Sequence, residues 1–221
     1  MALLFDRRIV GARELGIVQA CQRRIPSRLG GGAALAGVYL HHRLSNDADL
    51  FFNTRESLRE MVALLPDVAA ETNTALTVAR DAGTYVRVAI SPTEAGVEMD
   101  LVFDSAPRIE PAETQVEGVV VESLADLRAN KLTCILSRSE PRDLVDLLFL
   151  DRAGYPPERD LALALRKDAG LDPSVLAWLL GQFPVAPLPQ MLVPLNPAEL
   201  TAFRDDLRER LRQAAVPGER E

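Results

Sequence analysis

The chain has 221 residues, a formal net charge of −7, and a composition that is 48% hydrophobic and 26% charged. These values are typical of a globular protein with a sizeable core, and the acidic balance argues against a surface built mainly to bind nucleic acid. Two cysteines are too few for a disulfide framework, and no apolar run approaches the roughly 18 residues that a membrane span needs. The N-terminus lacks a signal-peptide core, so we expect a cytoplasmic protein without a membrane partner.

Residues 6–25 are predicted to form a helix, because apolar residues recur along them with imperfect helical spacing and Pro26 follows. This is the most basic part of the chain; its arginines and the one shortly after it are Arg7, Arg8, Arg13, Arg23, Arg24 and Arg28. The arginines indicate either a solvated helix face or a surface that contacts an RNA backbone.

A glycine step, Gly30, Gly31 and Gly32, comes next and leads directly into a helix-compatible segment, 33–40. Glycine can take a positive φ and places no side chain between the backbone and a ligand. At the start of a helix such a step offers free backbone N–H groups and the positive end of the helix dipole, which suits a phosphate. Taken alone, the step is also compatible with an ordinary loop.

Asp47 and Asp49 follow at positions i and i+2. If residues 48–52 form a strand, both carboxylates lie on the same face of it. Two carboxylates together with substrate phosphates suit Mg²⁺, although residues 45–47 are also rich in turn formers. A phosphate cradle beside a carboxylate-held metal is the equipment of phosphoryl or nucleotidyl transfer.

We expect a helix from residue 54 to about 65, then strands at 74–80, 84–91 and 97–104, with turns at 81–83 and 92–96. In the third strand Met99, Leu101 and Phe103 face one way, and Glu98, Asp100 and Val102 face the other. A buried, unpaired Asp100 would be costly, but it is tolerable beside a metal held by Asp47 and Asp49. Glu98 and Asp104 are alternatives for this third carboxylate.

Residues 105–118 are rich in proline and acidic residues, and we place a domain boundary there, between residues 1–115 and 119–221. The second part begins with a short strand at 119–121 and is otherwise predicted to be helical, at 124–137, 158–169, 173–182 and 197–215. Trp178 is expected in the core. The chain has two lysines, Lys131 and Lys167, and Lys131 lies within an apolar helix. Arg142 and Asp143 fit the start of another helix, with the acidic residue favoured by the dipole.

Several of these residues carry a family resemblance. The run from the glycines to the second aspartate resembles the AbiEii/AbiGii-type toxins of the DNA-polymerase-β-like nucleotidyltransferase superfamily, whose pattern reads GG(T/S)AL, then R(F/L)SxD(L/I)D(L/F). The matching residues are Gly31, Gly32, Ala34, Leu35, Arg43, Ser45, Asp47, Asp49 and Leu50. The chain departs from the pattern at Ala33, where the family has a small hydroxyl residue. The resemblance covers about residues 29–150.

The resemblance implies an α+β fold, with a polymerase-β-like mixed sheet and a helical C-terminal half that completes a cleft. It also implies Mg²⁺-dependent transfer of a nucleotide from an NTP to an acceptor, which for some members is a tRNA 3′ end, by the toxin of a toxin–antitoxin or abortive-infection pair. In this reading Asp47, Asp49 and Asp100 hold metal, and Asp100 also deprotonates or orients the attacking hydroxyl. Gly31, Gly32, Arg43 and Ser45 bind the nucleotide, and Lys131 neutralises the triphosphate.

The family pattern also contains R-D-x-x-D, which Arg142, Asp143 and Asp146 match here. By resemblance, Arg142 and Asp146 join the nucleotide site, with Asp143 as an alternative to Asp146 for orienting Lys131 or the substrate. Two other functions remain open: a nucleotide-binding regulatory module impaired by Ala33, and a transferase that modifies a small molecule and is not a toxin.

Overall fold

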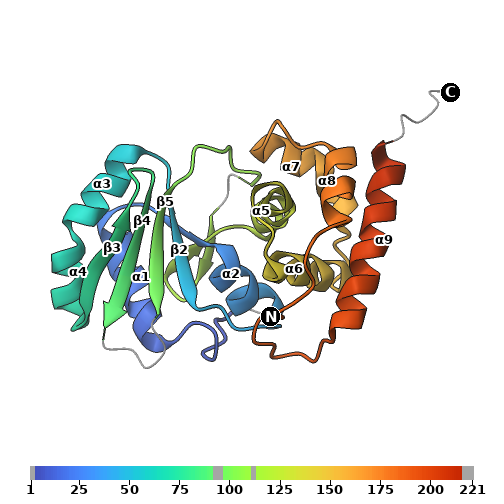
Figure 1. The fold of residues 1–221 in the computed structure, drawn as a ribbon. Coiled ribbons are helices and arrows are strands. Elements are labelled where there is room, and N and C mark those ends of the chain that lie inside the picture. Colours follow the sequence, from blue (N-terminus) through green and yellow to red (C-terminus); the bar gives the residue numbers. More distant parts are fainter. Residues whose placement is uncertain (1–2, 92–96, 111–112, 216–221) are drawn as a thin grey trace. The chain divides into compact units, whose positions relative to one another are not determined.

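The structure is a computed structural model that describes residues 3–91, 97–110 and 113–215 (Figure 1). The chain divides into two compact units. The first comprises residues 1–105 and 111–123, and the second comprises residues 106–110 and 124–221. Thus the strand at 119–121 groups with the first unit. The turn expected at 92–96 lies outside the described residues.

The first unit is built on a seven-stranded mixed sheet with the strand order β3-β4-β5-β2-β1-β7-β6. The strands are β1 (Arg28–Gly30), β2 (Asp47–Phe52), β3 (Ala75–Asp81), β4 (Tyr85–Ser91), β5 (Glu98–Phe103), β6 (Thr114–Val116) and β7 (Val119–Val121). β2 pairs with β5 in parallel, as does β1 with β7, and the other neighbours are antiparallel. The mixed α+β fold predicted from the sequence is therefore confirmed.

Among the described residues of this unit, five helical segments accompany the sheet. They are α1 (Ala12–Arg24), α2 (Gly31–Ala34), the π-helix η1 (Leu35–Leu40), α3 (Arg55–Ala63) and α4 (Leu65–Thr72). Contacts join α3 to β2 and β5, α4 to β3, and α1 to α4 and β7. Alternate residues of β2, Ala48, Leu50 and Phe52, are buried, so one face of the sheet is apolar and the other is left for polar groups.

Two helix predictions in this unit were wrong. The first helix begins at Ala12 and not at residue 6, because residues 7–10 form a turn in which Ile9 and Val10 are buried. The helix after β2 ends at Ala63, and a second helix, α4, starts at Leu65. Pro66, which follows the expected end of the helix at residue 65, instead occupies the first turn of α4, where proline is tolerated.

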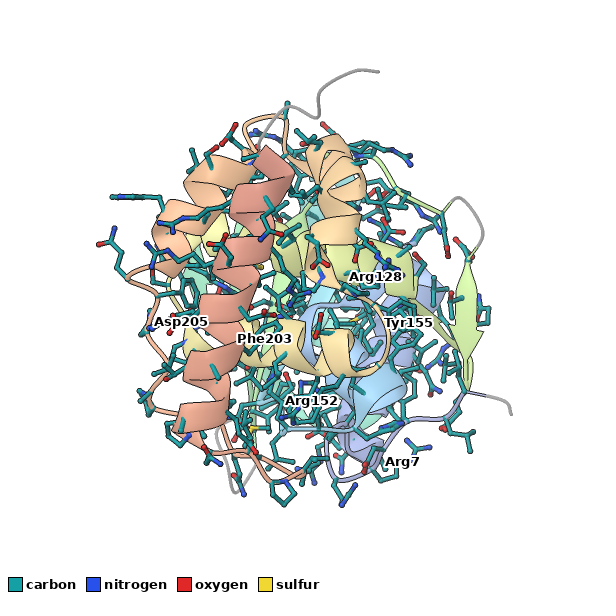
Figure 2. The ribbon with its side chains drawn as sticks, turned by 90° about the vertical axis from the view of Figure 1, so that its right-hand side faces the viewer. Arg7, Arg128, Arg152, Tyr155, Phe203 and Asp205 are labelled. Atoms are coloured by element: carbon teal, nitrogen blue, oxygen red, sulfur yellow. The ribbon has the colours of Figure 1, made fainter. Side chains whose placement is uncertain are left out.

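The second unit is helical. Its elements are α5 (Leu124–Ser137), α6 (Pro141–Arg152), the 3₁₀ helix η2 (Pro157–Asp160), α7 (Leu161–Lys167), α8 (Pro173–Leu180) and α9 (Pro197–Ala215). Asp172 caps α8 by accepting hydrogen bonds from the N–H groups of Ser174 and Val175. Arg128 of α5 stacks over the ring of Tyr155 at 4.4 Å, which fixes α5 against the loop after α6 (Figure 2).

Trp178 is not in the core as predicted, because 65% of its surface is exposed. α8 is apolar nearly all round, so its sequence does not reveal the buried face. In the structure Leu176, Ala177 and Leu180 are the buried residues of α8, and α8 packs on α9. Within the described residues no helix is long and apolar enough to cross a membrane.

The segment 106–110 is attached to the second unit by a buried carboxylate. Asp126 of α5 accepts hydrogen bonds from the backbone N–H groups of Ile109 (2.8 Å) and Glu110 (3.3 Å). The same carboxylate pairs with the ammonium group of Lys167 at 2.6 Å, and both side chains are nearly inaccessible to solvent. The expected linker at 105–118 therefore contains an anchored segment, and it also contains strand β6.

Candidate active site

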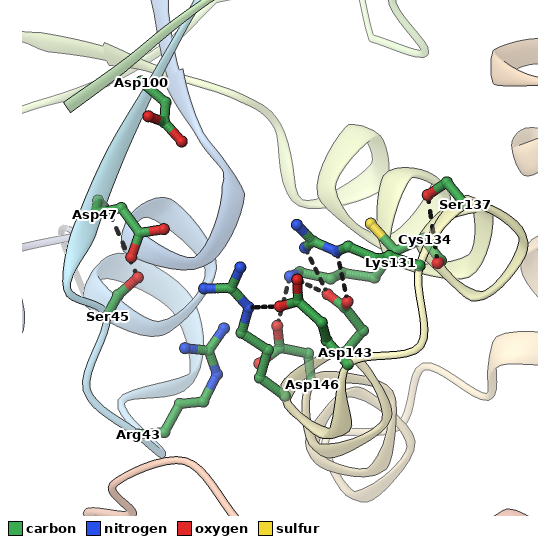
Figure 3. Close-up of polar contacts among 12 residues, drawn as sticks. Arg43, Ser45, Asp47, Asp100, Lys131, Cys134, Ser137, Asp143 and Asp146 are labelled. Carbon is green, nitrogen blue, oxygen red and sulfur yellow. Dashed lines mark hydrogen bonds and ion pairs between the residues drawn. The ribbon is translucent and has the colours of Figure 1, made fainter. Parts of the chain in front are cut away.

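Three predicted acidic residues share the polar face of the sheet in the first unit. β2 carries Asp47 and Asp49 two residues apart, and the parallel register places Asp49 opposite Asp100 of β5. Because side chains alternate along a strand, the register places all three carboxylates on the same face. Figure 3 shows Asp47 and Asp100 on that face. Glu98, the first alternative to Asp100, pairs in register with Asp47. Asp104, the second alternative, follows the end of β5 and lies 3.9 Å from Arg28.

The glycine step packs directly against these residues. Gly31 has φ +59°, and a Cβ placed there would overlap with the carboxylate of Asp49. A Cβ on Gly32 would lie 2.7 Å from Ser45 Oγ and 2.8 Å from Arg43 Nη2. The helix that follows is α-helical for four residues and continues as a π-helix, where a regular helix over 33–40 was expected. Both glycines therefore allow side chains of the candidate site to approach the backbone closely.

Arg43 and Ser45 lie in the segment that leads into β2. Arg43 is 2% exposed and donates a hydrogen bond to the carbonyl oxygen of Leu44 at 2.9 Å. Ser45 Oγ donates to the carbonyl oxygen of Asp47 at 3.4 Å (Figure 3). Burying a guanidinium group is costly, so Arg43 is a fixed positive charge next to Gly32 and not a solvated surface residue.

Asp100 is held by two residues that the sequence analysis missed. Tyr85 donates its hydroxyl hydrogen to Asp100 Oδ1 at 2.9 Å, and Arg87 donates from Nε and Nη2 to the two carboxylate oxygens at 3.0 Å each. Arg87 also lies 3.1 Å from Glu98. The hydrogen bond to Asp100 raises the pKa of Arg87, and burial followed by the contact with Asp100 raises the pKa of Tyr85. Alternation along the predicted strand 84–91 places Tyr85 and Arg87 on the same face, and this pattern is the sequence signal that could have identified them.

A second group of predicted residues lies in the second unit. Lys131 of α5 is 3% exposed, and its Nζ lies 3.0 Å from Asp143 Oδ1 and 2.6 Å from Asp146 Oδ2. Arg138 donates to both oxygens of Asp143, at 2.8 and 2.9 Å. Asp143 and Asp146 are fully buried. Both aspartates therefore contact Lys131, and Arg138 is a further member of this cluster.

Arg142 is placed differently from the rest of this group. Its Nε lies 2.5 Å from the carboxylate of Glu140, and about a third of its side chain is exposed. Arg142, the second residue of α6, therefore takes part in an ion pair at the helix start.

The buried charges of this group predict a pH dependence of stability. Burial opposes ionisation of Asp143, but Lys131 and Arg138 outweigh it and hold the pKa of Asp143 below its ordinary value. The stabilisation is thus present above the unfolded-state pKa of about 3.9 and is lost as the pH falls toward the folded-state pKa. We expect Asp143→Asn to be less stable than the parent protein at pH 6, with the difference shrinking below about pH 4. Urea unfolding from pH 3 to 6 measures this, and a difference that stays constant over the range would contradict it.

The carboxylate pair on β2 fits a divalent cation in part. Among the described residues, no three His, Cys, Asp or Glu side chains converge as a ready metal site. Asp47 and Asp49 supply two hard oxygen ligands beside a glycine, which suits a Mg²⁺ ion that completes its shell with substrate phosphates and water. Asp100 is occupied by Arg87 and Tyr85, so it would have to share its carboxylate to become a third ligand.

Comparison with known proteins also indicates a nucleotidyltransferase. The family model for the nucleotidyl transferase AbiEii toxin, Type IV TA system, matches residues 23–219, well beyond the motifs at 29–150. No curated protein sequence matches the chain significantly.

Solved structures with the same fold include JHP933 from Helicobacter pylori, with a TM-score of 0.59, 21% identity, and coverage of 92% of this chain and 90% of that one. A putative nucleotidyltransferase from H. pylori has a TM-score of 0.58 and 22% identity, with 91% and 92% covered. The nucleotidyltransferase toxin MenT4 from Mycobacterium tuberculosis H37Rv has a TM-score of 0.58 and 17% identity, with 92% and 86% covered. The match of the family model over nearly the whole chain shows that this protein belongs to the AbiEii family of nucleotidyltransferase toxins.

Proposed function

We propose that the protein transfers a nucleotide from an NTP to a hydroxyl group of an acceptor, in a Mg²⁺-dependent reaction, with tRNA as the acceptor to test first. The observation that carries this proposal is the register of β2 on β5, which aligns Asp49 with Asp100 beside the glycine step. Family membership supports the reaction class.

Asp47 and Asp49 would hold the metal, which when bound supplies positive charge to the phosphates and the leaving group. The oxygen of the acceptor hydroxyl would form a bond to the α-phosphorus as pyrophosphate leaves, and Asp100 would accept the proton of that hydroxyl. Arg87 and Tyr85 would keep the Asp100 carboxylate in a fixed orientation, because together they donate three hydrogen bonds to it.

Gly31 and Gly32 would give the phosphates access to backbone N–H groups, with Arg43 and Ser45 beside them. The family pattern assigns Lys131 to the triphosphate, with Arg142 and Asp146 in the same site. In support of an orienting role for the aspartates, Lys131 is held by Asp143 and Asp146 in a single position.

Transfer is tested by incubating the protein with Mg²⁺, each labelled NTP in turn, and total tRNA. Label on RNA that disappears on chelation of the metal supports the proposal. Label on small hydroxyl or amine compounds alone would favour the small-molecule transferase instead.

One observation favours the impaired module as a second candidate. Ala33, which replaces the family's hydroxyl residue, is 2% exposed and has no polar atom in its side chain to offer a phosphate. NTP-dependent thermal stabilisation without transfer to any acceptor would support that candidate.

Replacement of Gly31 by alanine should lower transfer by about 100-fold, because the added Cβ must displace the carboxylate of Asp49. Gly83→Ala is the matched control: Gly83 also has a positive φ, +81°, but nothing lies within 4 Å of its added Cβ. Both variants should lose about 1–2 kcal/mol of stability from backbone strain. Equal transfer by the two variants would show that Gly31 is not part of the active site.

The description of the family as a type IV toxin–antitoxin system supports a cognate antitoxin as partner and an action in the cytoplasm, where an NTP and tRNA meet. Expression of the protein should therefore arrest growth of a bacterial host, and Asp49→Asn should not. Growth arrest of equal strength by the parent protein and by Asp49→Asn would show that toxicity does not depend on nucleotide transfer.

A further inference from the structure

The outer side of α8 in the second unit carries an exposed apolar patch. Among the described residues, Trp178 is the most exposed large apolar side chain, and it is the single tryptophan of the chain. Val175 lies three residues earlier and is 44% exposed. Residues three apart are neighbours on a helix surface, so these two side chains form one patch, the Trp178 patch. Tryptophan is enriched in protein–protein interfaces, and an exposed one next to a second apolar side chain indicates a surface that another molecule covers.

Charges of opposite sign border the Trp178 patch. Asp172 is exposed at the start of α8, and both of its capping hydrogen bonds, from Ser174 and Val175, go to Oδ1. At the other end of α8, Arg208 of the adjacent helix α9 packs over Gly181, where an added Cβ would lie 3.4 Å from Arg208 Cζ (Figure 1). Within the part of the chain that the structure describes, neither charge forms an ion pair, and Arg208 Nε is buried without a hydrogen-bond partner.

The order of acid, apolar patch and base along α8 is complementary to itself. A two-fold axis through the Trp178 patch reverses the direction of α8 in the second copy. Asp172 of each copy then lies toward Arg208 of the other copy, and the two apolar patches cover each other. A nucleic acid fits this surface less well, because Asp172 would repel its phosphates. The distribution of charge therefore favours a second copy of the chain as the molecule that covers the patch.

We propose that two copies of the chain associate through α8 as a symmetric dimer, with Trp178 at the centre of the interface and the Asp172–Arg208 contacts on either side of it. This inference is independent of the proposed transfer reaction, because every residue it uses belongs to α8 and α9. The patch is small, and interfaces at the low end of the size range are transient, so we expect a dissociation constant of about 10 μM.

Association is measured by analytical ultracentrifugation, without NTP or metal, from about 1 μM to about 300 μM protein. The mass should rise from 24.2 kDa toward twice that value, and the emission of Trp178 should shift to shorter wavelength over the same range. Val175→Ser should raise the dissociation constant by about 10-fold or more. Val78→Ser is the matched control, because Val78 is a valine of nearly equal exposure, 42%, on β3 of the first unit, and it should associate like the parent protein. A mass that stays at 24.2 kDa throughout, or equal loss of association in both variants, would overturn the proposal.

Two charge reversals test the symmetry of the interface. Arg208→Glu and Asp172→Lys should each weaken self-association by about 10-fold or more, because like charges then meet at both contacts. An equimolar mixture of the two variants should associate like the parent protein, since in the mixed dimer each contact again joins opposite charges. Asp172→Lys also removes the cap of α8, so circular dichroism confirms that each variant is folded, and Val175→Ser tests the patch with the cap intact. Folded variants whose mixture associates no better than either variant alone would refute the symmetric dimer.

Discussion

Asp49→Asn should abolish nucleotide transfer, by about 10³-fold or more, in a protein that remains folded. The substitution keeps the shape of the side chain but removes the charge that would hold the metal. Removing even one uncharged hydrogen-bond donor that stabilises charge at a reacting centre lowers the rate by about 10²–10³-fold. Asp49 lies two residues from Asp47 on β2 and opposite Asp100 on β5, so two other carboxylates project from the same face of the sheet. Neutralising it should leave the melting temperature unchanged or slightly higher.

The control is Asp205→Asn, which makes the same chemical change at an exposed position on α9 (Figure 2), where the carboxylate pairs with Arg204 of the same helix. Transfer is measured with labelled NTP and tRNA at saturating Mg²⁺, and stability by thermal unfolding. If Asp49→Asn keeps one tenth of the parent's activity, Asp49 is not a ligand of the catalytic metal. A fall of many degrees in melting temperature would show instead that Asp49 is a structural residue.

Lys131→Met should destabilise the protein by about 3–5 kcal/mol, the cost of breaking a buried ion pair on one side only. Lys131 is 3% exposed and contacts two fully buried carboxylates, so the substitution leaves Asp146 without this ammonium group and Asp143 with Arg138. Methionine keeps most of the side-chain volume, which confines the effect to the lost charge. Urea unfolding followed by circular dichroism measures the change.

Two further variants separate charge from packing. Arg212→Met removes an exposed arginine that pairs with Glu209 at 3.8 Å, and it should change stability by no more than about 0.5 kcal/mol. Adding Asp146→Asn to Lys131→Met should recover part of the loss, because the buried negative charge goes with its partner. If Lys131→Met costs no more than Arg212→Met, the buried cluster of Lys131, Arg138, Asp143 and Asp146 does not stabilise the fold.

The strands that carry the carboxylates were predictable, because alternation along β2 and β5 is a local property of the sequence. The strand prediction at 48–52 is confirmed, and it starts one residue earlier, at Asp47. The pairing of β2 with β5 was less accessible, since about 50 residues separate them and their register is set by the sheet as a whole. The resemblance to a family supplied what alternation did not, by assigning Asp100 to the same site as Asp47 and Asp49.

Other features depended on tertiary contacts that no local pattern reports. Arg87 could be placed on a face of β4, but its bidentate contact with Asp100 requires the antiparallel register of β4 on β5. Trp178 was expected in the core, yet α8 buries the side that carries Leu176, Ala177 and Leu180 and leaves Trp178 exposed. Pro66 fits both the end of one helix and the start of another, and only the structure distinguishes them.

The anchoring of residues 106–110 by Asp126 has a consequence for dissecting this enzyme. The chain passes between its two units three times, after residues 105, 110 and 123. A fragment beginning at Leu124 would retain Asp126 and Lys167 but lack the two amides that the carboxylate caps. Neither half is one uninterrupted piece of polypeptide, so proteolytic nicking or truncation in this region should yield pieces that fold poorly alone and regain structure only when mixed.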